Sequence, residues 1–281
     1  MTPAVSACQG ALMTRVVIER DGIELVSEIE GPDEAPVVTL AHAQTLNRTS
    51  WDSLASTLID RYRVLRVDLR GHGESGTPVA DFTIDDLAED VVATLDAHQI
   101  TKTHFVGSSL GGMVGFPLAI DHSARLASVT FVATQGILPA ASQVTLKANG
   151  EALRSSGNPM SSLASKILAR YMNPDFSDRD PDGYQQLREQ IAGTSVEGYI
   201  RSSLAIIAMN FDDRLGRIGI PTMVIAGELD KPTPSERMEL YRDNIAGAQM
   251  AVIPGAGHFP FADQPDDFNR ALRTFLDSQD S

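Results

Sequence analysis

Residues 106–113 read Val106-Gly107-Ser108-Ser109-Leu110-Gly111-Gly112-Met113 and contain the pattern G-x-S-x-G. The segment 104–106 is predicted as a strand, and a helix is predicted from about Ser109. A sharp strand–turn–helix holds its serine in a strained backbone conformation, so that the hydroxyl projects from the carboxyl edge of a sheet. The stretch therefore predicts a nucleophilic Ser109. The alternative is a glycine-rich turn without chemistry.

Short apolar runs alternate with helical patterns on both sides of this stretch. Asp21-Gly22 joins two strand-like runs and is a strong hairpin signal. Thr83 and Asp86 match a capping box that begins a helix, and Ser50 is predicted to cap another helix. Strands are predicted over 15–20, 23–30, 37–40, 64–67, 104–106, 127–132, 221–226 and 250–253, with late helices over 236–244 and 265–276. The alternation predicts an α/β fold with a mostly parallel, doubly wound sheet.

The alternation of predicted strands and helices stops after Thr134. Residues 135–215 show helical spacing of apolar residues but no convincing strand. We expect a single domain whose core spans 15–134 and 216–281, with 135–215 inserted as a helical lid. A lid excludes water and supplies apolar walls to a pocket. Six bulky residues are candidates for those walls, although packing inside the lid is the favoured interpretation of each: Met160, Tyr171, Met172, Tyr199, Met209 and Phe211.

A serine hydroxyl becomes an effective nucleophile when a base accepts its proton. His258 is the predicted base, because it lies in a glycine-rich loop directly after the last predicted strand, where ligands bind in open α/β sheets. Asp230 follows the preceding strand along the chain and is predicted to fix the tautomer of His258. Asp68 ends another strand and is a rival acid. It ranks lower because it precedes Ser109, against the usual order of serine, acid and histidine.

Acyl transfer also needs hydrogen-bond donors for the oxygen that becomes negative. One donor is expected to be the backbone N–H of Leu110, the residue after the predicted nucleophile. The second is expected from the loop after the strand 37–40, near Ala43 or Gln44, and the backbone N–H of Gln44 is the preferred candidate. The predicted site therefore consists of three side chains and two backbone groups.

The amino-acid composition limits the kinds of partner and cofactor that this chain is expected to bind. The 281-residue chain has a formal net charge of −14, which argues against nucleic-acid partners and anionic membrane surfaces. Its single cysteine, Cys8, excludes an intramolecular disulfide and a zinc site of several thiolates. No apolar run is long enough to span a membrane, and Met1–Thr14 lacks the features of a signal peptide. We expect a cytoplasmic protein without a metal or organic cofactor, and its oligomeric state stays open.

Five segments in this order resemble the α/β-hydrolase superfamily over nearly the whole chain: 40–43, 66–75, 106–113, 221–230 and 253–258. Within it, the chain is most similar to the 3-oxoadipate enol-lactonase-like hydrolases. The resemblance implies an α/β-hydrolase fold and a small ester or lactone as substrate. Two departures stand out. Many relatives have His-Gly where this chain has His42-Ala43, and the enol-lactonases have Ser-Leu-Gly. Residues 135–138 also lack the Arg or Lys expected beside a dicarboxylate.

The predicted reaction is hydrolysis of a carboxylic ester or lactone through an acyl-enzyme intermediate on Ser109. Two further hypotheses are kept. A carbon–carbon bond hydrolase, or an acyltransferase or perhydrolase, would use the same three side chains on a different acyl group. A ligand receptor without turnover would also have this sequence, because a complete triad does not by itself specify a rate.

Overall fold

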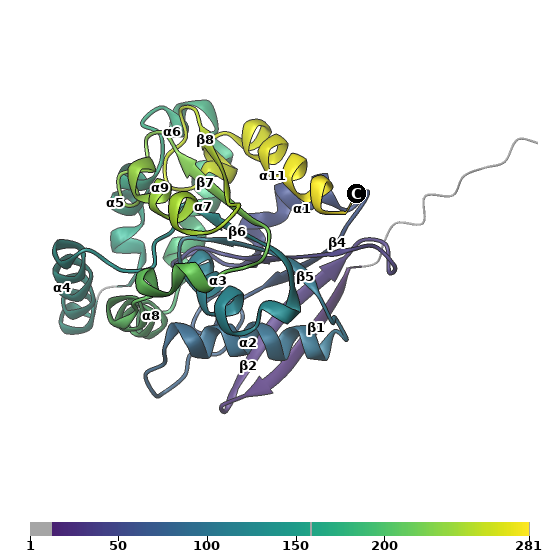
Figure 1. Cartoon of the computed structure of the whole chain (residues 1–281). Helices are drawn as coiled ribbons and strands as arrows, with labels where there is room; N and C mark the ends of the chain where they lie inside the picture. Colours follow the sequence, from purple (N-terminus) through teal and green to yellow (C-terminus); the bar gives the residue numbers. More distant parts are fainter. Residues whose placement is uncertain (1–12, 158, 281) are drawn as a thin grey trace, which may run out of the picture.

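The computed structural model describes residues 13–157 and 159–280, and this part of the chain forms one eight-stranded sheet (Figure 1). The strands are β1 (Thr14–Arg20), β2 (Ile23–Glu30), β3 (Val37–Ala41), β4 (Arg63–Val67), β5 (Thr103–Ser108), β6 (Leu126–Val132), β7 (Thr222–Gly227) and β8 (Gln249–Ile253). Their order in the sheet is β1-β2-β4-β3-β5-β6-β7-β8. β1, β2 and β4 pair antiparallel, and β4 through β8 run parallel in that order. The predicted α/β class is confirmed. Cys8 lies outside the described residues.

The predicted hairpin joins β1 to β2. Asp21 and Gly22 have φ angles of 53° and 74°, the two positive values that a type I′ turn requires. Glycine adopts such angles without steric cost, and aspartate tolerates them better than most residues do. The pair therefore fixes the register of the hairpin, in which Arg20 lies opposite Ile23.

Helices cover both faces of the sheet, as the alternating pattern predicted. Alternate residues of a strand point to opposite faces. In β5, Phe105 belongs to one hydrophobic cluster and its neighbour Val106 to the other. Helices α2, α3 and α9 contribute to the first cluster, and α1 and α11 to the second. The core helices are α1 (Asp52–Leu58), α2 (Ile84–Ala97), α3 (Leu110–Asp121), α9 (Ser235–Asn244), α10 (Pro260–Asp263) and α11 (Pro265–Gln279).

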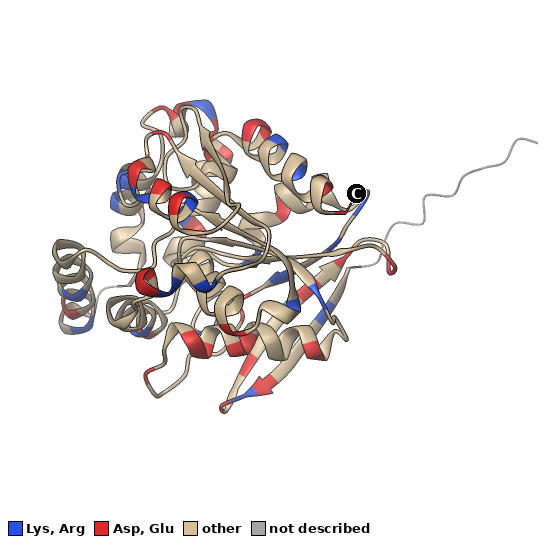
Figure 2. Cartoon of the chain, viewed as in Figure 1, with Lys and Arg blue, Asp and Glu red and all other residues tan. Residues whose placement is uncertain are grey.

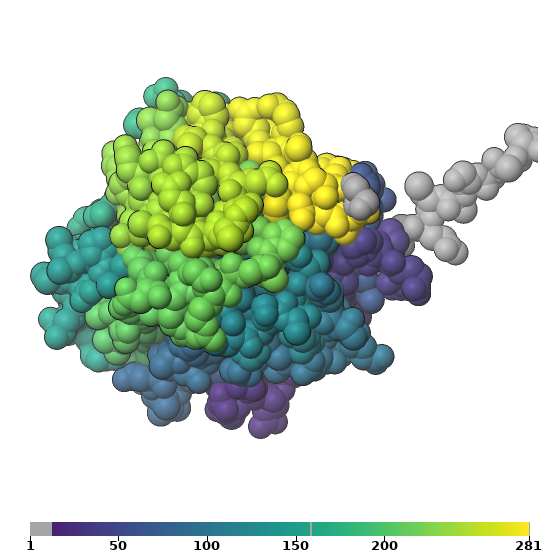
Figure 3. All heavy atoms as spheres, in the orientation of Figure 1, coloured from purple at the N-terminus to yellow at the C-terminus, as the bar shows by residue number. Residues whose placement is uncertain are grey.

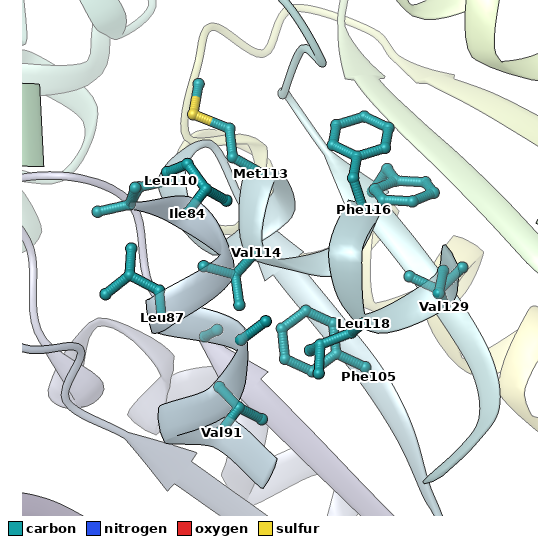
Figure 4. Close-up of a cluster of buried hydrophobic side chains, with 14 of the residues drawn as sticks. Ile84, Leu87, Val91, Phe105, Leu110, Met113, Val114, Phe116, Leu118 and Val129 are labelled. Carbon is teal, nitrogen blue, oxygen red and sulfur yellow. The ribbon is translucent and has the colours of Figure 1, made fainter. Parts of the chain in front are cut away.

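Helix α3 is the central helix of the first cluster. Figure 4 shows Leu110 and Val114 of α3 toward Ile84 and Leu87 of α2, and Leu118 next to Phe105 of β5. Of the twelve residues of α3, only Asp121 is not buried. Because α3 begins where the predicted nucleophile stands, this packing fixes the turn rigidly against the sheet.

Two helix starts test the predicted caps. The capping box at α2 is confirmed, since Thr83 accepts from the Asp86 N–H and the Asp86 carboxylate accepts from the Thr83 N–H. The predicted cap at Ser50 is wrong. A short 3-10 turn, η1 (Arg48–Trp51), precedes α1, and the side chain of Asn47 caps it by accepting from the Thr49 N–H at 2.9 Å.

A helical insertion separates β6 from β7. Its elements are α4 (Ala140–Ser156), α5 (Ser161–Tyr171), α6 (Phe176–Arg179), α7 (Pro181–Gly193), α8 (Val196–Ala208) and the 3-10 helix η3 (Asp212–Arg217). In the space-filling view its teal and green surface meets the yellow-green surface of the following segment (Figure 3). Helix α8 lies directly on the core, where the backbone of Gly198 touches that of Gly71 and a Cβ on either residue would collide with the other.

Charged residues lie mostly on the outer surfaces. Figure 2 shows acidic positions recurring along α2 and basic positions among the helices of the insertion. Arg48 is an exception, because it is buried and forms ion pairs with Glu28, Asp68 and Glu74. Within 13–157 and 159–280, no helix has the length and hydropathy needed to cross a bilayer.

Candidate active site

The turn between β5 and α3 has the geometry that the G-x-S-x-G pattern predicted. Ser109 has a φ of 49° and a ψ of −109°, a combination that side-chain-bearing residues rarely adopt. A Cβ on Gly107 would collide with the carbonyl of Gly111, and a Cβ on Gly111 would collide with the carbonyl of Ala41. Glycine at these two positions therefore allows the turn to close and α3 to pack against β3.

Three predicted side chains meet at the carboxyl edge of the sheet. The Ser109 hydroxyl oxygen lies 3.0 Å from Nε2 of His258, and Nδ1 of His258 lies 2.8 Å from Oδ2 of Asp230. Thr233 also holds the Asp230 carboxylate, its N–H donating to Oδ1 at 3.0 Å and its hydroxyl to Oδ2 at 2.5 Å. The Asp230 side chain is fully buried and that of His258 almost so. Serine, histidine and aspartate thus form one continuous chain of hydrogen bonds.

The insertion helps to position His258. The His258 N–H donates to the carbonyl of Tyr171 at the end of α5, and the Tyr171 ring meets the imidazole edge-on with centroids 4.7 Å apart. Asp263 accepts from the N–H groups of Gly257 at 2.7 Å and Asn173 at 3.0 Å, so it joins the histidine loop to the insertion. Burial raises the pKa of the Asp263 carboxyl. Nothing in the sequence indicates this role, because Asn173 lies 90 residues from Asp263.

The rival acid Asp68 has other partners. Its carboxylate accepts from the backbone N–H groups of Arg48 at 2.7 Å and Glu74 at 2.9 Å, and from the Arg48 guanidinium. Asp68 therefore organises the loop after β4 rather than contacting His258.

Other histidines have structural surroundings. Burial lowers the pKa of His42 to about 4 and that of His72 to about 3, so both imidazoles are neutral at pH 7. Nε2 of His42 accepts from the Leu69 N–H at 3.0 Å, while Nδ1 of His104 faces the Ser128 hydroxyl at 2.9 Å. These contacts tie neighbouring loops and strands together.

The two residues expected to supply oxyanion donors adjoin Ser109 in sequence or share its cavity. Leu110 is the first residue of α3, so its N–H has no acceptor within the helix. Gln44 lines the same cavity as Ser109, and its side-chain amide donates to the hydroxyls of Ser202 at 2.8 Å and Ser203 at 3.0 Å on α8. The structure thus shows a contact between Gln44 and the insertion that the sequence did not predict.

A cavity of about 230 Å³ opens above Ser109 and His258, with the insertion forming much of its wall. Of the six bulky candidates, Tyr171 and Tyr199 line it, whereas the other four are buried side chains. Lys166 and Arg170 of α5 also line the cavity. Two basic residues therefore line the cavity, although 135–138 contains neither Arg nor Lys.

Among residues 13–157 and 159–280, no group of three or more His, Cys, Asp or Glu side chains is arranged to hold a metal ion.

Comparisons with known proteins define the class. A family model for the alpha/beta hydrolase fold matches residues 36–265, and the chain therefore belongs to the α/β-hydrolase family. It is 29% identical to 3-oxoadipate enol-lactonase 1 of Acinetobacter baylyi, over 94% of this chain and 97% of that protein. The crystal structure of the enol-lactonase from Burkholderia xenovorans LB400 superimposes with a TM-score of 0.87 at 28% identity, covering 93% of this chain and 99% of that one.

An esterase is also among the similar solved structures. A thermophilic esterase from Thermogutta terrifontis, solved with malate bound, has a TM-score of 0.87 and 27% identity, covering 95% of this chain and all of that chain. The predicted resemblance to 3-oxoadipate enol-lactonases is confirmed, and esterases are among the structural neighbours.

Proposed function

We propose that this protein is a serine hydrolase that cleaves a carboxylic ester or lactone through an acyl-enzyme intermediate. The observation that supports this most strongly is the hydrogen-bonded chain from Ser109 through His258 to Asp230, beside a cavity of about 230 Å³. A hydroxyl 3.0 Å from an imidazole nitrogen is within reach for direct proton transfer. The relatives named as enol-lactonases and as an esterase support the substrate class.

In the proposed mechanism, Ser109 Oγ attacks the carbonyl carbon while Nε2 of His258 takes its proton. Buried Asp230 holds the Nδ1–H tautomer and stabilises the imidazolium. The carbonyl oxygen becomes negative and accepts from the backbone N–H groups of Leu110 and Gln44. His258 then returns the proton to the leaving oxygen, which departs as an alcohol or, from a lactone, stays tethered as the far end of the acyl chain.

Water completes the cycle. His258 takes a proton from a water molecule, and the hydroxide oxygen attacks the acyl carbon. The second tetrahedral intermediate collapses, the proton goes back to Ser109 Oγ, and the carboxylic acid is released. The helical insertion acts as a lid that limits how much water reaches the cavity.

Turnover distinguishes this proposal from a receptor that reacts only once. We expect p-nitrophenyl butyrate, or one member of a panel of enol-lactones and homoserine lactones, to be hydrolysed at many product equivalents per protein. Release of a single equivalent followed by a stable acyl-protein would contradict the proposal and favour the receptor. Product analysis with added alcohol or hydrogen peroxide identifies an acyltransferase or perhydrolase, because either acceptor would then compete effectively with water.

Lys166 and Arg170 indicate a carboxylate on the substrate, away from the bond that breaks. They lie four residues apart on α5, line the cavity and form no ion pair within the described residues, in a chain of net charge −14. Because both side chains are exposed, solvent screens them and each contributes modestly. We propose that they attract a carboxylate-bearing ester or lactone.

Removing both cations should therefore change substrate preference. In the Lys166→Ala/Arg170→Ala variant, we expect KM for mono-p-nitrophenyl succinate to rise about 3- to 10-fold, with little change for uncharged p-nitrophenyl butyrate. Lys147→Ala is the matched control, since Lys147 is exposed on α4 and does not line the cavity. An equal change in KM for both esters would contradict a role in carboxylate recognition.

A further inference from the structure

Gln135 has a buried side chain whose amide is not used by the described part of the chain. The residue follows β6, is 5% exposed and lines the cavity together with Ser109. Its side-chain oxygen and nitrogen form no hydrogen bond with any residue in 13–157 or 159–280. Nearly all buried polar groups in native proteins are hydrogen-bonded, because leaving one without a partner is unfavourable. The partner of this amide therefore has to come from the cavity.

The Gln135 amide is accessible to a molecule in the cavity. Neither Oε1 nor Nε2 is among the side-chain atoms of the described residues that are both shielded from solvent and unpartnered. Since both atoms lack a partner, both must be accessible. Gln44, the other glutamine in the cavity wall, differs, because its amide already donates to the hydroxyls of Ser202 and Ser203. Of these two glutamines, only Gln135 has an amide that is free to bind a ligand.

The chain on the N-terminal side of Gln135 contacts the nucleophile turn. The Ser109 N–H donates to the Val132 carbonyl at 2.9 Å, and the Thr134 hydroxyl donates to the Ser109 carbonyl at 2.7 Å. Gln135 is the next residue, so its side chain enters the cavity from the β6 side of this turn. The expected oxyanion donors lie elsewhere, at the start of α3 and in the loop after β3. Gln135 therefore faces a part of the substrate that lies close to the reacting carbonyl.

The backbone is fixed on both sides of Gln135. Thr134 is held at the nucleophile turn, as described above. The Gly136 N–H donates to the Tyr241 hydroxyl at 2.7 Å, and the Gly136 carbonyl accepts from the Phe211 N–H at 2.9 Å. Tyr241 and Phe211 are themselves buried in the core. A polar group on such a rigid backbone is ordered before the substrate arrives, so that binding costs less entropy.

The chemistry of an amide side chain limits what Gln135 can bind well. Oε1 accepts hydrogen bonds and Nε2 donates them, so a neutral group that both donates and accepts, such as a hydroxyl or an amide, can use both atoms. A carboxylate would use only Nε2 and would place its negative charge beside Oε1. The cavity supplies Lys166 and Arg170 for a carboxylate. The amide therefore suits a second, uncharged part of the substrate.

We propose that Gln135 is a specificity-determining residue whose amide binds a hydroxyl or amide group of the substrate, close to the bond that breaks. The inference rests on the proposed hydrolysis of an ester or lactone and defines a chemical feature of its substrate. An alkyl group at this place would displace water from the amide without replacing its hydrogen bonds. A site built to bind a substrate hydroxyl discriminates strongly against the analogue that lacks it.

Three matched pairs of esters test for the group and locate it. A hydroxyl on the acyl side distinguishes p-nitrophenyl 2-hydroxybutyrate from p-nitrophenyl butyrate. A hydroxyl on the alcohol side distinguishes 2-hydroxyethyl butyrate from propyl butyrate. An amide N–H distinguishes the p-nitrophenyl ester of N-acetylglycine from p-nitrophenyl 4-oxopentanoate. We expect kcat/KM, divided by the rate of spontaneous hydrolysis, to favour the polar member of at least one pair by about tenfold or more.

Gln135→Met removes both amide atoms and keeps the length of the side chain. We expect the preference to fall below about twofold, because the polar ester loses about 5- to 20-fold in kcat/KM while its alkyl partner changes little. The midpoint of thermal unfolding should equal or exceed that of the parent, since an unpartnered buried amide has been removed. Gln185→Met is the matched control, because Gln185 is exposed on α7 and does not line the cavity. It should keep the parental preference.

The outcomes keep this inference apart from the proposed function. A parent without a preference in any pair, or an undiminished preference in Gln135→Met, would overturn the role of Gln135. A larger loss for mono-p-nitrophenyl succinate than for every neutral polar ester would also overturn it, since the amide would then bind the carboxylate. If Ser109→Ala is inactive on the same esters, the proposed function stands in each of these cases. If Ser109→Ala hydrolyses them at the parental rate, the proposed function itself is wrong.

Discussion

Ser109→Ala is expected to lower kcat/KM for p-nitrophenyl butyrate by about 10⁴- to 10⁶-fold. The substitution removes the atom that would attack the carbonyl, so the acyl-enzyme route closes and only binding and the oxyanion donors contribute. Folding should be retained, because the backbone at this turn is held by close glycine packing and by the Ser109 N–H donating to the Val132 carbonyl at 2.9 Å. Initial rates and thermal unfolding, measured on the same preparation, check both expectations.

The neighbouring serine provides the control. Ser108 is the last residue of β5, is completely buried, and its hydroxyl has no hydrogen-bond partner among the described residues. Ser108→Ala should therefore keep a rate within a few-fold of the parent. A fully active Ser109→Ala, or an inactive but folded Ser108→Ala, would assign the chemistry to another group.

Asp230→Asn is expected to lower kcat by about 10⁴-fold. When the amide oxygen takes the place of Oδ1 on the Thr233 N–H, the amide NH2 group faces Nδ1 of His258, so the required Nδ1–H tautomer is lost and the imidazolium is no longer stabilised. The side-chain oxygen of asparagine still accepts from the Thr233 N–H, so the local fold should persist. Steady-state kinetics together with circular dichroism test this combination.

Asp68→Asn is the matched comparison, because it removes the carboxylate of the rival acid. We expect its main effect on the free energy of unfolding, since buried Arg48 would lose one of its ion-pair partners. The folded fraction should hydrolyse ester at close to the parental rate. A parental rate in Asp230→Asn together with a large loss of kcat in folded Asp68→Asn would transfer the role of acid to Asp68.

Local sequence signals predicted much of the core. The hairpin at Asp21-Gly22 and the capping box at Thr83 depend on neighbours within a few residues, so their geometry is encoded locally. Meeting of Ser109, Asp230 and His258 was predicted from topology, since each follows a strand of one parallel sheet and such strands end at the same edge.

Ambiguous local signals set one limit of prediction. The helix start at Ser50 was misassigned because a serine and an asparagine three residues apart both match a cap, and the 3-10 turn decides between them. The acidic segment 178–182 spans the end of α6 and the start of α7, with Asp180 as the N-cap of α7. A cap and a solvated loop have similar compositions.

Several of the residues that line the cavity could not be predicted from the sequence. Lys166 and Arg170 reach the cavity only because of how α5 lies against the core, and no local pattern encodes that. Thr45 also lines the cavity and has a φ of 71°, but nothing in the sequence indicates this, because threonine is an ordinary loop residue and the partners that hold its loop lie about 150 residues away. A glycine at position 45 would have indicated a positive φ at this position.

Covalent labelling with a fluorophosphonate, followed by peptide mapping with tandem mass spectrometry, tests the acyl-enzyme mechanism most directly. Fluorophosphonates react with serines activated by a neighbouring base and form a stable analogue of the tetrahedral intermediate. We expect one adduct per chain, located on Ser109, retained in Ser108→Ala and absent from Ser109→Ala and from His258→Ala. An adduct that maps to another residue, or equal labelling of Ser109→Ala, would contradict the mechanism.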